Sequence, residues 1–191
     1  MQLVVGLGNP GARYSATRHN IGFVVLERLA QARGGQWREQ FESGTADVSI
    51  SGERVLLQKP QTFMNLSGFS VVKAANFFKI PAKDVIVVHD EVDLPLGDVR
   101  LKRGGGEAGH NGLRSISEQL GTQDYVRLRC GVGRPPPEFR GDLADFVLQA
   151  FPPEQGPQVE SLVEGAIKAL EMLFKLGLEQ AMNQANRRPK T

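Results

Sequence analysis

The sequence predicts an α/β fold in a single domain. Short β-branched runs alternate along the chain with segments of helical periodicity, which is the pattern typical of α/β proteins. One run, Val85–Val88, is continuously apolar, as expected for a strand that is buried on both faces of a sheet. The 191 residues, of which 40% are hydrophobic, are near the usual size of one domain with one core.

In the first part of the chain, strands and helices are expected to alternate. The apolar run Leu3–Val5 predicts a first strand, and apolar residues at helical spacing predict a helix over Ile21–Leu29. Two β-branched segments, Thr45–Ile50 and Val55–Gln58, predict the next strands. The segment Ser67–Phe78 again has helical spacing and predicts a second helix.

The second part of the chain is expected to complete the sheet. Strands are predicted at Val85–Val88, at Val99–Lys102 and, after a glycine-rich loop and a short helix over Leu113–Leu120, at Val126–Val132. The segment Gly133–Gly141 is rich in Pro and Gly and predicts a loop, so the last strand should precede it.

The C-terminal part is expected to cover the sheet and then to leave it. Apolar residues recur at helical spacing from Val159 to Leu178, which predicts a terminal helix packed on the sheet. The segment Asn186–Thr191 carries three cations and predicts a flexible, solvated basic tail. No internal repeat is visible, so all 191 residues are assigned to one domain.

Composition excludes several classes of protein. The net charge of +2 is too small for a protein that coats nucleic acid through bulk charge, so any such contact must be local. The single cysteine, Cys130, excludes an internal disulfide and a cysteine-based zinc site, which fits a reducing compartment. The sequence lacks a basic leader and any run of about 18 apolar residues, which favours a cytoplasmic protein without a membrane partner.

The segment Gly6–Gly11 has the spacing of a dinucleotide-binding turn after a strand. Such a turn needs a helix whose first amides face the pyrophosphate, but the following residues, Ala12–Asn20, are polar and aperiodic. We therefore interpret the segment as a tight turn that presents Asn9 at the end of the first strand. Taken alone, this asparagine is more simply interpreted as an ordinary structural turn residue.

A histidine and an aspartate are candidates for acid-base chemistry. His19 precedes a predicted helix, and Asp90 follows the buried strand, where open α/β sheets place their sites. Imidazole with a carboxylate on its second nitrogen suits a general base that activates water. A covalent mechanism is disfavoured, because the sequence lacks a G-x-S-x-G elbow and Cys130 lies inside a predicted strand.

An alternative use of the same region is a metal site. Asp90, Glu91 and Asp93 beside His89 would suit Mg²⁺ or Zn²⁺, and a metal would indicate a phosphohydrolase. The sequence offers no second carboxylate cluster and no paired histidines at helical spacing to complete such a site. Glu91 and Asp93 are interpreted as solvated turn residues.

Two further segments each allow a structural and a functional interpretation. Lys59–Gly68 leads from a strand into a helix, where Asn65 or Ser67 would serve as the helix N-cap. Between residues 100 and 140 there are 8 basic and 4 acidic residues, and this local excess predicts either a phosphate-binding patch or a solvated strand face.

Five separated motifs lie at Gly6–Gly11, Thr17–Asn20, Lys59–Asn65, His89–Glu91 and Gly104–Gly112. Together, and in this order, they resemble the motifs of bacterial peptidyl-tRNA hydrolase. The resemblance runs from about Leu3 to Asn183. Departures are minor: Val92 replaces the commoner leucine, and Cys130 occupies a variable strand position.

The resemblance implies a monomeric single domain with a mixed twisted β-sheet surrounded by α-helices. It implies an enzyme that acts on peptidyl-tRNA released prematurely from ribosomes, with RNA and not DNA as partner and with no cofactor or metal. In this family pattern His19 is the general base and Asp90 holds it in its basic form. Asn9 helps to distinguish N-blocked from free aminoacyl groups.

The resemblance also implies binding residues. Those that would line the cleft for the peptide and the tRNA 3′ end are Tyr14, Phe63, Met64, Asn65, His110 and Asn111. Lys102 and Arg129 match positions associated with tRNA phosphate binding. The alternative from another class is a noncatalytic RNA-binding module on the same fold. The presence of both His19 and Asp90 argues against it, because a binder needs no tautomer-fixing pair.

Overall fold

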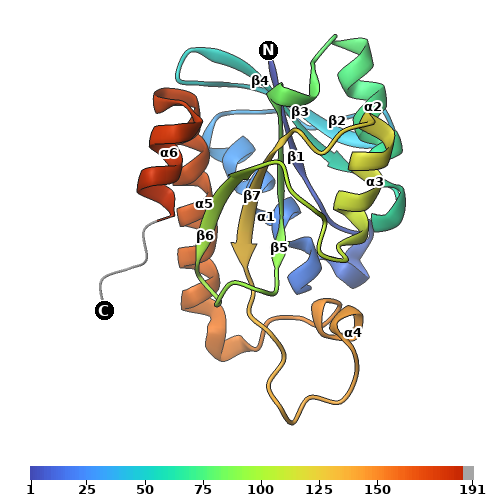
Figure 1. The fold of residues 1–191 in the computed structure, drawn as a ribbon, viewed down its shortest axis with the longest axis vertical. Coiled ribbons are helices and arrows are strands. Elements are labelled where there is room, and N and C mark those ends of the chain that lie inside the picture. Colours follow the sequence, from blue (N-terminus) through green and yellow to red (C-terminus); the bar gives the residue numbers. More distant parts are fainter. Residues whose placement is uncertain (187–191) are drawn as a thin grey trace.

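A seven-stranded mixed β-sheet forms the centre of the computed structural model, which describes residues 1–186 (Figure 1). The strand order is β2-β3-β4-β1-β5-β7-β6, with β4, β1, β5 and β7 parallel and the remaining pairings antiparallel. The strands are β1 (Gln2–Gly6), β2 (Arg38–Gln40), β3 (Ser43–Ile50), β4 (Glu53–Pro60), β5 (Val85–Glu91), β6 (Val99–Arg103) and β7 (Val126–Gly131). The predicted α/β fold with a mixed sheet is confirmed.

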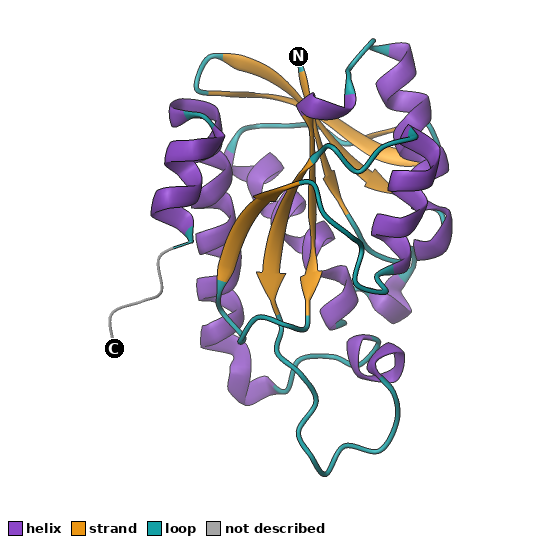
Figure 2. Cartoon of the chain, in the orientation of Figure 1, coloured by secondary structure: helices purple, strands orange, loops and turns teal. Residues whose placement is uncertain are grey.

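Helices cover both faces of this sheet (Figure 2). One face carries α1 (Ile21–Ala32), α5 (Gly156–Leu176) and α6 (Leu178–Ala185), and the other carries α2 (Ser67–Phe77) and α3 (Asn111–Leu120). The short helix α4 (Leu143–Val147) lies beyond the ends of β5 and β7 (Figure 1).

The core consists of two apolar layers, one on each side of the sheet. Successive residues of β1 alternate between them, with Val4 in the layer under α1 and α5, and Leu3 and Val5 in the layer under α2. All three are fully buried, as expected for a central parallel strand. The apolar run that predicted the strand is therefore shared between the two layers.

Every strand expected from the sequence is present, but β2 and α4 were missed. The three residues of β2 are exposed at the sheet edge and polar, so they lack the apolar alternation that marks a half-buried strand. The predicted terminal helix also differs, because it is two helices. Gly177, with a φ of 84°, ends α5, and α6 follows directly.

The start of α2 is determined by close packing against α3. The backbone N–H of Gly68 donates to Ser115 Oγ at 2.8 Å, and a Cβ on Gly68 would collide with the Ser115 carbonyl oxygen. Neither predicted N-cap forms: the residue before α2 is Leu66, and the Ser67 hydroxyl donates instead to the carbonyl of Met64. The contact brings the segments that precede the two helices to one place, beyond the carboxyl ends of β1 and β5.

The described chain ends against the edge strand β6. The side chain of Asn186 accepts from Leu101 N at 2.8 Å and donates to Leu101 O at 3.1 Å. Asn186 was expected to open the basic tail but is fixed to the sheet, and the remainder of that tail, residues 187–191, lies outside the described residues. Within the described part, no helix has the length and apolarity needed to cross a membrane.

Candidate active site

A cleft of about 460 Å³ opens at the carboxyl ends of the parallel strands, between the starts of α2 and α3 and the helix α4. Nine of the eleven residues predicted for the site line it. These are Asn9, Tyr14, His19, Phe63, Met64, Asn65, Asp90, His110 and Asn111. They come from widely separated segments of the chain, so the topology of the sheet collects them. The other two predicted residues, Lys102 and Arg129, lie outside the cleft lining.

Close packing places His19 beside the end of β5. Leu7 N donates to Val88 O at 3.0 Å, which ties the turn after β1 to β5. A Cβ on Gly22 would lie 2.5 Å from both Leu7 N and Val88 O, so only glycine lets the first turn of α1 approach this closely. His19 lies in the 3₁₀ turn Arg18–Asn20 that leads into this first turn.

His19 and Asp90 meet in the cleft. His19 Nδ1 lies 2.8 Å from Asp90 Oδ2, and the carboxylate is buried, whereas the imidazole is partly exposed. Burial by itself lowers the pKa of His19, but the charge and the hydrogen bond of Asp90 outweigh it and raise that pKa above its ordinary value. With Nδ1 held as a donor to the carboxylate, Nε2 is the nitrogen left to accept a proton.

Asp90 has a second histidine partner, which the sequence did not reveal. His110 Nε2 lies 2.8 Å from Asp90 Oδ1, and the rings of His19 and His110 are 5.0 Å apart. Burial alone raises the pKa of Asp90, but the two histidines together hold it well below its ordinary value. Asp90 is therefore an anion that bridges two imidazoles.

The third histidine, His89, does not take part in this arrangement. Its Nδ1 lies 2.8 Å from the carbonyl oxygen of Asp90, and burial lowers its pKa to about 3. A fully buried imidazole of this kind stays neutral at physiological pH and is poorly placed to exchange protons with a substrate.

The metal site considered from the sequence does not form. Glu91 pairs with Arg129 at 2.9 Å, and Asp93 pairs with Arg134, so neither acid turns toward His89. Glu91 is therefore not a solvated turn residue, contrary to prediction. In the part of the chain that the structure describes, the one His and carboxylate group close enough to share an ion is His19, Asp90 and His110, with ligand atoms within 4.8 Å.

Asn9 is fixed in place by three hydrogen bonds. Its Oδ1 accepts from Met64 N at 2.9 Å, its backbone N–H donates to Asn20 Oδ1 at 2.8 Å, and its carbonyl accepts from Asn20 Nδ2 at 2.9 Å. The Asn9 Nδ2 group forms no hydrogen bond within residues 1–186, so it is the donor left for the cleft. Asn20 was missed as a site residue, although it closes the Thr17–Asn20 motif.

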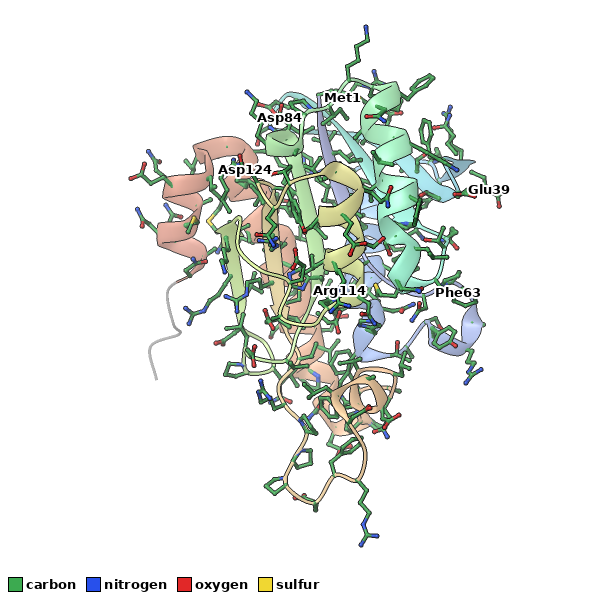
Figure 3. All side chains as sticks on the ribbon, turned by 45° about the vertical axis from the view of Figure 1, so that its right-hand side comes forward. Met1, Glu39, Phe63, Asp84, Arg114 and Asp124 are labelled. Carbon is green, nitrogen blue, oxygen red and sulfur yellow. The ribbon has the colours of Figure 1, made fainter. Side chains whose placement is uncertain are left out.

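The remaining cleft residues form a mixed apolar and amide wall. Met64 is buried, whereas Phe63 is 63% exposed at the surface (Figure 3). Asn65 and Asn111 are both exposed, and neither side chain is engaged by another described residue. The cleft therefore offers two uncommitted amides beside an exposed aromatic ring.

Helix α4 forms one side of the cleft and is held there by Arg18, the neighbour of His19. The buried Arg18 guanidinium donates to Phe146 O at 3.0 Å and lies 3.9 Å from the centre of the Phe146 ring. Leu143 and Val147 then face the cleft. The sequence could have indicated the start of α4, because Asp142 and Asp145 have the three-residue spacing of a capping box. The structure forms this capping box.

Lys102 and Arg129 lie on the sheet edge formed by β6 and β7. Lys102 lies opposite Arg127 in the register of the two strands. Arg129 is two residues further along the strand, so the side chains of Lys102 and Arg129 lie on the same face of the sheet. Arg129 is engaged with Glu91 at 2.9 Å, whereas the exposed Lys102 forms no ion pair with any residue from 1 to 186. The predicted phosphate patch is therefore a cationic strand face beside the cleft. Among its described residues, both Lys102 and Arg100, which lies opposite Arg129 in register, form no ion pair.

Comparison with known proteins identifies the family. A family model described as peptidyl-tRNA hydrolase matches residues 3–191. A peptidyl-tRNA hydrolase of Nocardia farcinica is 53% identical over 95% of this chain and 94% of its own length. That of Citrifermentans bemidjiense is 50% identical over 98% of each chain.

Solved structures agree with this match. A crystal structure of peptidyl-tRNA hydrolase from Acinetobacter baumannii, 38% identical, superimposes with a TM-score of 0.89 over 97% of this chain and 94% of that one. The similarity therefore extends over both the sequence and the fold. The resemblance inferred from the five motifs is confirmed, and the chain belongs to the peptidyl-tRNA hydrolase family.

Proposed function

We propose that this protein hydrolyses the ester bond between a peptide and the 3′ end of tRNA, with a water molecule activated by His19. One observation carries the proposal: His19 Nδ1 is bound to the buried Asp90 carboxylate, which leaves Nε2 as a base in the cleft. Family membership indicates the substrate. The arrangement suits an aminoacyl ester, which is reactive enough to be cleaved by an aligned water molecule.

The reaction follows from the donors and acceptors in the cleft. Water gives a proton to His19 Nε2 while its oxygen attacks the ester carbonyl, and Asp90 stabilises the imidazolium that forms. The amide groups of Asn9, Asn65 and Asn111 are suited to donate hydrogen bonds to the oxyanion or to the peptide. When the tetrahedral intermediate collapses, the ribose oxygen leaves with the proton from His19, which regenerates the base.

Incubation with N-acetyl-aminoacyl-tRNA tests the proposal against a noncatalytic RNA-binding module. Hydrolysis releases free tRNA and the N-acetylated amino acid, whereas a binding module leaves the substrate intact. The same assay with EDTA tests the expectation that no metal is required, because a metal-dependent enzyme would lose activity. Absence of tRNA release under conditions where binding is detected would contradict the proposed hydrolysis.

We expect the enzyme to cleave unblocked aminoacyl-tRNA slowly relative to its N-acetylated form. A free α-amino group is cationic near neutral pH and lacks the acylated amide that neutral asparagine side chains can pair with. The informative variant is Asn9→Asp, because it keeps the Oδ1 that Met64 N requires and replaces the Nδ2 donor with an anionic oxygen, which also favours a cationic free amino group. The ratio of kcat/KM values on the two substrates should narrow in this variant. Equal rates with the unmutated protein would exclude such discrimination.

Lys102 and Arg129 are proposed to contact a tRNA phosphate beside the cleft. Phosphate contacts contribute affinity and salt dependence, so Lys102→Ala should raise KM for full tRNA substrates and flatten the dependence of log KM on log salt, with kcat unchanged. Arg129→Ala should also raise KM and flatten its salt dependence, but it additionally removes the ion-pair partner of Glu91. Lys175→Ala, in the last turn of α5 on the opposite side of the sheet, is the matched control.

A minimal substrate separates this role from catalysis. With a peptidyl ester of a short 3′ fragment, Lys102→Ala should match the unmutated enzyme. An equal loss of kcat on the fragment and on full tRNA would place Lys102 in the catalytic centre or in the fold. The expected monomer, the preference for RNA over DNA and the cytoplasmic location remain predictions, and light scattering and competition with DNA test the first two.

A further inference from the structure

The hydrogen bonds of His110 define its tautomer. Its Nδ1 accepts from the backbone N–H groups of Gly112 at 3.1 Å and Leu113 at 3.4 Å, so His110 is the N-cap of α3. Backbone amides only donate, and Nδ1 must therefore be unprotonated. The remaining nitrogen, Nε2, then carries the hydrogen that it donates to Asp90 Oδ1 at 2.8 Å.

This tautomer determines how Asp90 meets His19. With Oδ1 occupied by His110, the carboxylate presents Oδ2 to His19 Nδ1. The carboxylate is thereby held from both sides in one orientation, and the N–H of His19 is directed inward. His19 Nε2 is consequently directed away from Asp90 and carries the free electron pair.

The groups that face His110 Nδ1 are hydrogen-bond donors. His19 and His89 lie with ring centres 5.0 and 5.3 Å away, and the carboxylate of Asp90 is bound to Nε2. A proton on Nδ1 would point at the amides of Gly112 and Leu113, at the positive end of the ten-residue helix α3.

We propose that His110 is a positioning residue, held as the neutral Nε2–H tautomer by the start of α3, that fixes the Asp90 carboxylate on His19 instead of binding substrate. This assignment rests on the proposed function, in which His19 is the base. The same tautomer leaves Nε2 without an electron pair for a metal ion, so the group of His19, Asp90 and His110 is arranged for hydrogen bonding and not for metal binding.

NMR of the ring nitrogens tests the tautomer directly. The chain has only three histidines, so ¹⁵N-histidine labelling with single His→Asn variants assigns every ring signal. For His110 we expect an unprotonated Nδ1 and a protonated Nε2, and for His19 the opposite. Protonation of His110 Nδ1 in the folded protein would overturn the proposal. The measurement requires no catalysis, so it stays valid if the protein fails to cleave peptidyl-tRNA.

Two variants of His110 distinguish its role as the N-cap of α3 from its hydrogen bond to Asp90. In His110→Asn, the Oδ1 atom can replace Nδ1 as the cap, but the side chain is too short to reach Asp90. Loss of a hydrogen bond to a charged group should lower kcat by roughly tenfold with KM nearly unchanged. His110→Gln can reach Asp90 but caps poorly, so it should recover part of kcat while lowering the melting temperature.

Other outcomes would contradict the positioning role. A parental kcat in His110→Asn would show that the bond to Asp90 does not matter for the reaction. An increase in KM with kcat unchanged in both variants would assign His110 to substrate binding. If the unmutated protein releases no tRNA but shows the expected ring signals, the proposed function fails and the tautomer assignment stands.

Discussion

His19→Ala is expected to lower kcat for N-acetyl-aminoacyl-tRNA by at least about a hundredfold, because a positioned general base contributes roughly 10² to 10⁴ in rate. The loss should fall on proton transfer, since the His19 side chain forms a hydrogen bond to Asp90 and belongs to neither apolar core layer. KM should change little. Single-turnover kinetics would report the chemical step without interference from product release.

The control for His19→Ala is chemical rescue. The substitution removes an imidazole from a partly exposed position, so free imidazole in the buffer should restore part of the rate. Circular dichroism and the melting temperature should match those of the unmutated protein. A kcat near normal would remove His19 from the role of base, whatever its contact with Asp90.

Asp90→Asn is expected to lower kcat by at least about tenfold, since it replaces one of two hydrogen bonds to a buried charge with an unfavourable contact. An amide has one oxygen, but two histidine N–H groups face this position, from His19 and from His110. Whichever way the introduced amide turns, its NH₂ group would face one of them. If the NH₂ group faces His19, that ring loses its orientation or its preferred tautomer. If it faces His110, the bond that holds residue 90 in place is lost.

The pH profile gives Asp90→Asn a second readout. The unmutated enzyme should lose kcat/KM as pH falls through the raised pKa of His19, because the protonated ring cannot accept a proton from water. The acidic limb should thus lie above the ordinary imidazole pKa of about 6.5. Burial alone lowers the pKa of His19, so removing the carboxylate should move this limb to lower pH. An unchanged limb would exclude Asp90 as the partner of the base.

Local patterns account for the parts of the fold that could be predicted. Val85–Val88 is apolar at every position because β5 is covered by helices on both faces. Burial on both faces requires a continuous apolar run, which is visible in the sequence. The same reasoning failed for β2, whose exposed edge position imposes no apolar pattern. The same reasoning predicted one helix in place of α5 and α6, because the apolar spacing continues across Gly177. The break between the two helices depends on the positive φ of Gly177, which the apolar spacing does not show.

The site was predictable as a set of residues but not as an arrangement. The motifs indicated the family and its residues, yet His110 appeared only as a cleft residue, whereas in the structure it caps α3 and bonds Asp90. Arg129 was grouped with Lys102 as a phosphate-binding cation, and the sequence did not reveal that it pairs with Glu91. In both cases the partner lies at least 20 positions away in the sequence. No periodicity relates such residues.

The sequence by itself determined the α/β class, the order of most elements and the family, because burial imposes repeating apolar patterns and the five motifs stand in family order. Only the tertiary structure decided which groups carry protons. The 2.8 Å contacts of Asp90 with His19 and His110 arise because β5, the turn before α1 and the start of α3 converge at one edge of the sheet. Proton positions follow from such short contacts between distant segments, and a linear sequence does not encode distances between them.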